Sequence, residues 1–346
     1  MINCWVDVTV NLQIIVSESL GVRGLSCFIE HRGEKVLIDP GVALGYTRWG
    51  LHPHPIQAVA GDEVRKKIRD LWKITDYVVF SHMHGDHVPL YNANPFQLSI
   101  HHLEYRDNLL IIAPSISTLK GKEKTRLEKI INVYDGRVLT FEHGCFETGP
   151  ISIYGPYPHG TCSRTLTYAS LIDAGEKVMH LSDTELLCDK LVELVLQLKP
   201  DIIITDGPPI YRFLNNRFIV RALLRKASRN LLKLSKVAHT IVVDHHVNRC
   251  CEGYQWIRAM SRKQQNTRVV TGAEFMDKKP LFLESLRRAL YRYYPVDNLW
   301  FEKRYGEILE EYRPIYHKIV NAVNSCKTFS SLEELIENIL RRTTRG

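Results

Sequence analysis

The stretch SHMHGDH, residues 81 to 87, places three histidines and an aspartate within seven positions. His82 and His84 lie two residues apart, so on extended chain they project to the same side and can hold one cation. The glycine that follows permits a sharp change of direction, after which Asp86 and His87 can face a second position nearby. Imidazole and carboxylate groups bind divalent metals, so the stretch predicts part of a metal site. A solvated polar turn is the alternative, and it requires no further ligands.

The elements that would position these side chains are short apolar runs between segments of helical spacing. The runs are rich in Val and Ile and bounded by Gly, Pro, Asp or Ser, which is typical of buried strands. They lie at 12 to 16, 26 to 30, 35 to 39, 77 to 80, 178 to 182, 201 to 205, 240 to 244 and 268 to 272. Helical spacing covers 61 to 73, 122 to 131, 185 to 198 and 217 to 236. This mixture predicts an α/β fold with helices outside the sheets.

Polar residues follow several of these runs directly. Examples are Asp39, Ser81 with His82, Asp183, Asp206, and Asp244 with two histidines. Loops at the strand ends of an α/β sheet gather into a crevice, so these groups are expected to converge. The candidates for further metal ligands are His159 in PHG, Asp183 in LSD, and His245 or His246 in DHH.

An HxHxDH motif after an apolar strand, then a lone His, an Asp after a strand and a final His after another strand, resembles the ligand series of the metallo-β-lactamase superfamily. SHMHGDH, PHG, LSD and DHH match this series in order. More narrowly, SESLGVRGLSCFIE, LIDPGVALGYTRWGLHPHPI, DGPPIY and VVDHHVNR resemble an archaeal family of uncharacterised proteins within the superfamily, over about residues 12 to 300. The resemblance implies an αββα sandwich of the metallo-β-lactamase type, here with a helical C-terminal extension.

The resemblance also implies a role for each ligand. One metal is expected on His82, His84 and His159, and the other on Asp86, His87 and a terminal histidine. His245 is the preferred terminal ligand, and His246 stays open. Asp183 would bridge the two metals. Asp39 would steady the ligand loop without binding metal itself.

The chemistry that follows is hydrolysis. With no cysteine among the ligands, zinc is the expected metal, and manganese or iron are alternatives. Two ions about 3.5 to 4 Å apart would hold a bridging water whose pKa falls toward about 7. The resulting hydroxide would attack an electrophilic carbonyl or phosphorus while the metals stabilise the developing charge. We therefore expect a dinuclear metal-dependent hydrolase, with Asp86 and Asp183 at its catalytic centre.

The charge pattern favours an anionic substrate, with a phosphodiester, a nucleotide or nucleic acid foremost. The formal net charge is +8, and residues 211 to 240 contain eight basic residues and no acidic one. Arg217, Arg221 and Arg225 recur every four positions, so on a helix they form a basic stripe, which is either an anion-binding surface or a solvated face. Further candidates for substrate contacts are His52, His54 and Asp206.

Two other functions fit the same residues. An ester, lactone or thioester hydrolase would use the same metals on a different bond. A protein that binds nucleic acid or a partner through its basic helix and its C-terminal helices would need a metal only for structure. Structural zinc sites are closed by four protein ligands, often including Cys, and this tells against the second alternative.

The chain of 346 residues is expected to contain a metal-hydrolase domain at 11 to 275, an N-terminal extension at 1 to 10 and a helical C-terminal extension at 276 to 346, packed on the core. The final predicted helix covers 330 to 342 and begins with a capping box. No run of eighteen apolar residues and no secretory signal is recognised, so we expect a cytoplasmic protein without a membrane partner. The oligomeric state stays open.

Overall fold

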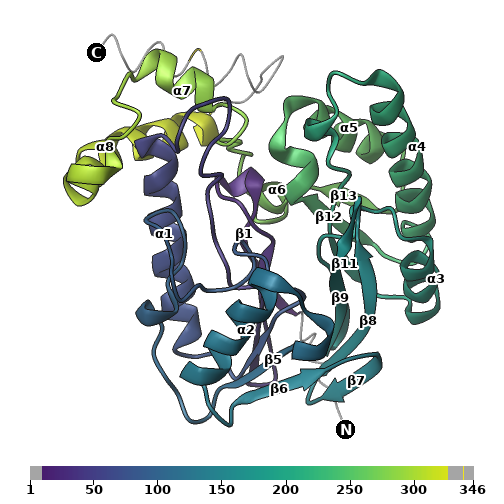
Figure 1. The fold of residues 1–346 in the computed structure, drawn as a ribbon. Coiled ribbons are helices and arrows are strands. Elements are labelled where there is room, and N and C mark those ends of the chain that lie inside the picture. The colour runs from purple at the N-terminus through teal and green to yellow at the C-terminus, as the bar shows by residue number, and fades with distance from the viewer. Residues whose placement is uncertain (1–9, 326–337, 339–346) are drawn as a thin grey trace, which may run out of the picture.

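The computed structural model describes residues 10 to 325 and Asn338, and it contains two mixed β-sheets packed against each other (Figure 1). The first sheet has the order β1-β2-β3-β4-β5-β6. It is antiparallel from β1 to β3 and parallel from β3 to β6. Its strands are β1 (Asn11–Val16), β2 (Ser26–His31), β3 (Glu34–Ile38), β4 (Tyr77–Val79), β5 (Leu110–Pro114) and β6 (Val138–Phe141).

The second sheet has the order β13-β12-β11-β10-β9-β8-β7. It is antiparallel from β7 to β10 and parallel from β10 to β13. Its strands are β7 (Gly144–Thr148), β8 (Ile151–His159), β9 (Cys162–Ala174), β10 (Glu176–Leu181), β11 (Ile202–Asp206), β12 (Thr240–Asp244) and β13 (Arg268–Val270).

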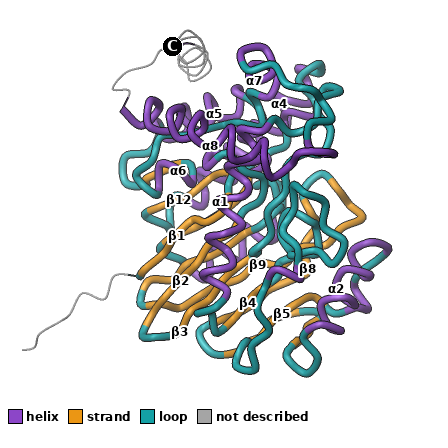
Figure 2. The backbone as a smooth tube through the Cα atoms, turned by 90° about the vertical axis from the view of Figure 1, so that its left-hand side faces the viewer, coloured by secondary structure: helices purple, strands orange, loops and turns teal. Residues whose placement is uncertain are grey.

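Apolar side chains of both sheets fill the space between them. Ile38 and Val79 of the first sheet share one buried cluster with Ile153, Ile204 and Val242 of the second. Helices cover the outer faces: α1 (Pro55–Trp72) and α2 (Gly121–Val133) on the first sheet, and α3 (Asp189–Leu198), α4 (Arg217–Leu234) and α5 (Cys251–Arg262) on the second. In Figure 2, α1 runs across the strands of the first sheet. The predicted αββα sandwich is confirmed.

Short helical segments join these layers. Five are 3₁₀ helices, Glu18–Leu20, Ile100–His102, Ile116–Thr118, Ile210–Arg212 and His245–Arg249, and one is the α-helix α6 (Gly272–Phe275). A backbone hydrogen bond also joins β9 of the second sheet to the loop after β4 of the first, because the Tyr168 N–H donates to the Ser81 carbonyl at 3.0 Å. The loops after β4 in one sheet and after β10 and β12 in the other therefore face each other.

The C-terminal part of the described chain packs on α1. It contains α7 (Arg287–Tyr293) and α8 (Phe301–Ser325). Leu290 and Ile319 of these helices share a buried cluster with Ile56 and Ile68 of α1. The predicted helix at 330 to 342 lies, apart from Asn338, outside the described residues, as do residues 1 to 9 of the predicted N-terminal extension. The division of the chain near residue 275 stays a prediction.

Among the residues that the structure describes, no helix combines the length and the apolar character needed to span a bilayer.

Candidate metal centre

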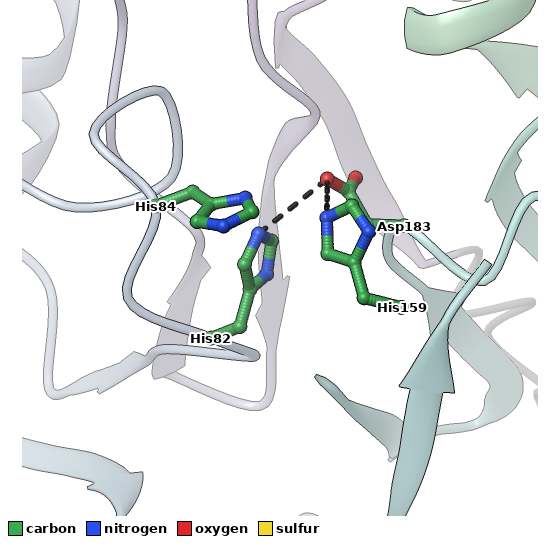
Figure 3. A group of neighbouring side chains, drawn as sticks. All are labelled: His82, His84, His159 and Asp183. Carbon is green, nitrogen blue, oxygen red and sulfur yellow. Dashed lines mark ion pairs between the residues drawn. The ribbon is translucent and has the colours of Figure 1, made fainter. Parts of the chain in front are cut away.

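Four side chains from three separate segments of the chain converge on one point (Figure 3). They are His82, His84, His159 and Asp183, and one ligand atom of each lies within 4.8 Å of the others. Asp183 Oδ2 is 2.8 Å from His159 Nε2 and 3.4 Å from His82 Nε2. Both nitrogens are buried and lack a well-directed hydrogen bond to any described residue. Buried polar atoms normally have a partner, so these nitrogens fit a site for a cation.

A second group of ligand atoms adjoins the first. It consists of Asp86, His87 and His245, again within 4.8 Å of one another. Asp183 also lies beside this group, because its Oδ2 is 3.4 Å from His87 Nε2 and its Oδ1 is 3.5 Å from His245 Nε2. One carboxylate thus faces both groups. The structure brings together every residue that the sequence predicts as a metal ligand.

Buried carboxylates fix the orientation of the imidazoles in the second group. His87 Nδ1 is 3.0 Å from Asp39 Oδ2, and His245 Nδ1 is 2.8 Å from Glu18 Oε2. When the ring is neutral, a proton on each Nδ1 can be donated to the carboxylate, which leaves the Nε2 lone pair free for a cation beside Asp183. Histidines that bind metals in proteins are commonly held in this way.

Asp39 also fixes the loop that carries the HxHxDH motif. The Ser81 backbone N–H donates to Asp39 Oδ1 at 2.7 Å, and the Ser81 hydroxyl donates to Oδ2 at 2.5 Å. Gly41 lets the loop approach closely, because a Cβ at this position would lie 2.3 Å from the His87 backbone. These contacts have the loop-steadying character that the resemblance implied for Asp39.

Glu18, which the sequence did not single out, is held beside the centre by Asp244. The buried carboxylate of Asp244 accepts hydrogen bonds from the backbone N–H of Ser19 at 3.1 Å, of Gly272 at 2.8 Å and of His245 at 2.7 Å. Ser19 lies in the 3₁₀ helix that follows β1, Gly272 begins α6, and His245 begins the 3₁₀ helix that follows β12. Asp244 therefore joins the segment that carries Glu18 to the segment that carries His245.

A buried guanidinium, also missed from the sequence, lies against the second group. Arg249 donates from Nε to Glu18 Oε1 at 2.6 Å. Its Nη2 is 3.3 Å from Asp86 Oδ2 and 3.1 Å from His245 Nε2. Arg23 adds a second cation, because its Nε donates to Asp86 Oδ2 at 2.9 Å. The guanidinium groups of Arg249 and Arg23 thus contact ligand atoms of the second group.

The electrostatics of the centre favour an ionised carboxylate among imidazoles. Burial alone would raise the pKa of Asp183, but the surrounding imidazoles, above all His87, hold it well below its ordinary range. Burial lowers the pKa of His82 to about 3, so its ring is neutral and its lone pair is available. Burial opposes the charge on His245, yet Glu18 and then Asp183 raise its pKa to about 10.

His246 lies behind this arrangement, and Asp206 lies behind His246. His246 Nδ1 is 2.7 Å from Asp206 Oδ2, while its Nε2 is 3.8 Å from Asp183 Oδ2. His245, and not His246, shares a ligand group with Asp86 and His87, so the geometry favours His245 as the terminal ligand. Asp206 is fully buried and accepts from the Glu185 backbone at 2.7 Å. Asp206 thus anchors His246, and a contact between Asp206 and substrate stays a prediction.

The side of the centre at His84 is open. The His84 side chain is 32% exposed, and its Nε2 is 3.2 Å from Oε1 of Glu123, another residue that the sequence did not single out. A hollow of about 800 Å³ begins at His84. Basic side chains dominate its lining, namely Lys120, Lys122, Arg126 and Arg164. An anion can therefore approach the first ligand group from this side.

The two predicted substrate-contacting histidines before α1 have other partners. His54 is fully buried; its Nδ1 accepts from the Ile56 backbone at 3.2 Å and its Nε2 donates to the Tyr294 carbonyl at 2.8 Å. Both nitrogens of His54 are thus engaged by the backbone, and a contact between His54 and substrate stays a prediction. His52 is half-buried, with Nδ1 2.9 Å from the Tyr46 carbonyl and its ring edge-on to Phe301. No described metal-ligand residue contacts it.

The basic stripe predicted at 217 to 225 exists as an exposed face of α4. Arg217, Arg221 and Arg225 are exposed, whereas Asn230 and Leu231 turn inward. None of the three arginines forms an ion pair or hydrogen bond with a ligand of the two groups in the described chain. Their role in binding an anion stays a prediction.

Comparisons with known proteins place the chain in a family. No family model matches it. A UPF0282 protein of Methanosarcina mazei is 35% identical over 294 residues, covering 84% of this chain and 95% of the relative. A UPF0282 protein of Pyrococcus horikoshii is 34% identical over 295 residues, covering 80% of this chain and 92% of the relative. A solved structure of a diphosphatase from the PhnP family is similar at 17% identity, with a TM-score of 0.38, over 68% of this chain and 85% of that chain. The extent and identity of the sequence matches show that the chain belongs to the UPF0282 family.

Proposed function

We propose that this chain is a dinuclear metal-dependent hydrolase. The observation that carries the proposal is the position of Asp183, whose two oxygens lie beside two separate groups of histidine and aspartate ligands. The donor set of imidazole nitrogens and carboxylate oxygens suits zinc, with manganese or iron as alternatives. When bound, two such ions would supply Lewis acidity and would lower the pKa of a water molecule.

Two groups of residues would each bind one of these ions. The first group, His82, His84 and His159, offers two buried nitrogens and one that is open to solvent. The second group, Asp86, His87 and His245, is oriented from behind by carboxylates. Asp183 would serve both positions. Rigid outer contacts of this kind keep ligand atoms in place as substrate exchanges.

We propose a phosphodiester as the bond that is cleaved. The support is the hollow beside His84, which is lined by Lys120, Lys122, Arg126 and Arg164 and by one acidic residue, Glu123. A surplus of positive charge at the mouth of a centre attracts phosphate groups and raises the rate of association. Esters and lactones that carry no charge would gain nothing from these side chains.

The alternative in which a metal serves only structure requires a closed set of four protein ligands. The exposure of His84 argues against closure, because solvent reaches the first group. An ester, lactone or thioester hydrolase would use the same centre, and only a comparison of substrates separates it from a phosphodiesterase.

The test uses the full-length chain loaded with zinc. Bis(p-nitrophenyl) phosphate, p-nitrophenyl acetate and a γ-lactone are offered side by side, and hydrolysis is followed for the wild type, His84→Ala and Asp183→Ala. His101→Ala replaces an exposed histidine outside the centre and serves as the matched control. We expect phosphodiester cleavage that both centre variants abolish and the control keeps. Cleavage that survives in both centre variants contradicts the assignment, and preferential cleavage of the acetate or lactone shifts it to the alternative.

A further inference from the structure

A second basic pocket opens next to the centre, on the side of Arg249. Its volume is about 330 Å³. Four arginines and an exposed tryptophan contribute to its lining, namely Arg48, Arg249, Arg288, Arg292 and Trp49. This pocket is separate from the hollow at His84, with which it shares no lining residue.

A strained turn holds the tryptophan in this pocket. Trp49 and Gly50 form the two central residues of a tight turn, with φ angles of 54° and 77°. Arg48 and Leu51 close the turn through reciprocal backbone hydrogen bonds of 2.9 and 3.0 Å. A bulky residue with positive φ is costly, on the order of 1 kcal/mol, and such strain is concentrated at functional positions. Trp49 is nevertheless 44% exposed, so burial of its ring does not account for the strain.

The tryptophan ring organises two of the guanidinium groups. Arg48 lies over the Trp49 ring with its Cζ 4.2 Å from the centroid, and Arg288 lies over it at 4.7 Å. Cation–π contacts of this kind hold a guanidinium in one orientation and leave its N–H donors free. The turn therefore places two cationic groups close together, although their charges repel each other.

Carboxylates of the described chain only partly neutralise the pocket. Arg48 lies 3.6 Å from Glu284, and Arg249 is engaged by Glu18. Arg288 and Arg292 are exposed, and neither forms an ion pair with a carboxylate among the described residues. Glu252 is the acidic residue in the lining. Arg288 and Arg292, which have no ion pair in the described chain, lie beside the exposed ring of Trp49 and suit the pocket to an anion.

Arg249 connects this pocket to the metal centre. It lines the pocket and also donates to Asp86, one of the ligands of the second group, at 3.3 Å. We propose that the pocket binds a terminal phosphate group of the substrate, while the bond to be cleaved lies at the centre. This inference rests on the proposed phosphodiesterase function and assigns the substrate class as a phosphodiester that carries an additional phosphate monoester.

The first experiment measures binding and does not require hydrolysis. Isothermal titration calorimetry of AMP, with adenosine as the ligand that lacks phosphate, uses the full-length zinc-loaded wild type, Arg288→Gln/Arg292→Gln and Arg32→Gln/Arg262→Gln. The last variant removes the same charge from two exposed positions that line neither basic pocket, and it is the matched control. We expect the affinity for AMP to fall at least about tenfold in the pocket variant and to stay within about twofold in the control. Adenosine is expected not to bind measurably.

Unchanged affinity for AMP in the pocket variant overturns the proposal, as does an equal loss in the matched control. The same titration on Asp183→Ala separates the pocket from the centre. If this variant still binds AMP in a manner that depends on Arg288 and Arg292, the pocket stands even where no hydrolysis is found. If Asp183→Ala alone abolishes binding, AMP occupies the centre and the pocket proposal falls.

The second experiment tests the link to catalysis. The KM for a 5′-phosphorylated thymidine dinucleotide is compared with that for the same dinucleotide without the terminal phosphate. We expect Arg288→Gln/Arg292→Gln to raise KM at least about tenfold for the phosphorylated substrate only, because the charge-assisted contacts are lost with that phosphate alone. An equal change for both substrates contradicts recognition of a terminal phosphate.

Discussion

The two ligand groups at Asp183 differ in what surrounds them. In the first group, His84 is 32% exposed, and neither ring nitrogen of His159 has a well-directed hydrogen bond to a described residue. In the second group, His87 and His245 are fully buried and each is oriented by a buried carboxylate. The first group is thus open at His84, and its His159 lacks the carboxylate at Nδ1 that orients each histidine of the second group.

The charges around the two groups differ as well. The Arg249 guanidinium lies within 3.3 Å of Asp86 and within 3.1 Å of His245 Nε2, so it competes with a metal ion for the same atoms. The nearest charged neighbour of the first group outside the ligands is a carboxylate, Glu123. Orientation favours metal binding in the second group while charge opposes it. We infer that the two positions bind metal with unequal affinity and that the first position fills first.

Replacing the shared carboxylate, Asp183, is expected to weaken metal binding in both groups. Asp183→Ala deprives both positions of a ligand, so both steps of a zinc titration should weaken by more than about 100-fold, beyond the loss typical of outer-shell residues. Zinc affinity is measured by competition with a chromogenic chelator. A variant that loses only one step would show that Asp183 serves a single position.

Glu18→Gln is expected to act on one group only. The amide keeps the shape of the side chain but no longer holds the proton on His245 as a carboxylate does, so zinc affinity at the second step should fall about 10- to 100-fold. Glu123→Gln is the matched variant beside the first group. It should leave the second step unchanged, and an identical effect of the two variants would contradict the distinction between the groups.

Arg249→Gln is expected to change the zinc affinity of the second step in the opposite direction. Removing a positive charge next to Asp86 should strengthen the second step of the zinc titration by about tenfold and bring the two steps closer together. The same chelator competition measures the effect. If the second step weakens instead, Arg249 supports the ligands and does not compete with the metal.

His54 provides a contrast between an imidazole outside the centre and those within it. Burial lowers the pKa of His54 to about 4 from its ordinary 6.5. Between pH 4 and pH 6.5 the unfolded chain binds a proton at His54 that the folded chain does not. The contribution of His54 to the free energy of unfolding is therefore present above pH 6.5 and is lost as the pH falls toward about 4. From pH 7 to pH 5.5 the contribution of His54 to the free energy of unfolding should drop by about 1 kcal/mol.

Urea denaturation of the zinc-loaded wild type and of His54→Gln at the two pH values measures this contribution. The variant should lose less stability than the wild type over the interval. Parallel losses in the two proteins would show that His54 does not titrate as its burial requires.

Much of the fold and most of the candidate ligands could be predicted because their signals are local. The apolar run at 77 to 80 became β4 (Tyr77–Val79), and the run at 201 to 205 became β11 (Ile202–Asp206). The strands β5 to β9 were missed, and β7, for instance, is mostly exposed and carries no apolar run. The ligand series could be found because it consists of short motifs in a fixed order.

The outer contacts of the centre could not be predicted, because they join residues far apart in the chain. Glu18 meets His245 across 227 positions and Arg249 across 231, and no local spacing connects them. The partners of His54 could not be predicted for a related reason. In the Pro-rich segment LHPHPIQ it had the character of an exposed loop residue, whereas it caps α1 beneath the carbonyl of Tyr294.

The metal content of the purified full-length chain tests the central claim most directly. Inductively coupled plasma mass spectrometry, with protein quantified by amino-acid analysis, gives the number of ions per chain after loading with zinc and removal of the excess. The arrangement of both ligand groups around Asp183 predicts two zinc ions per chain, of which a chelator removes one more readily. A single ion that resists the chelator, or no retained metal, would contradict a centre built on a shared carboxylate.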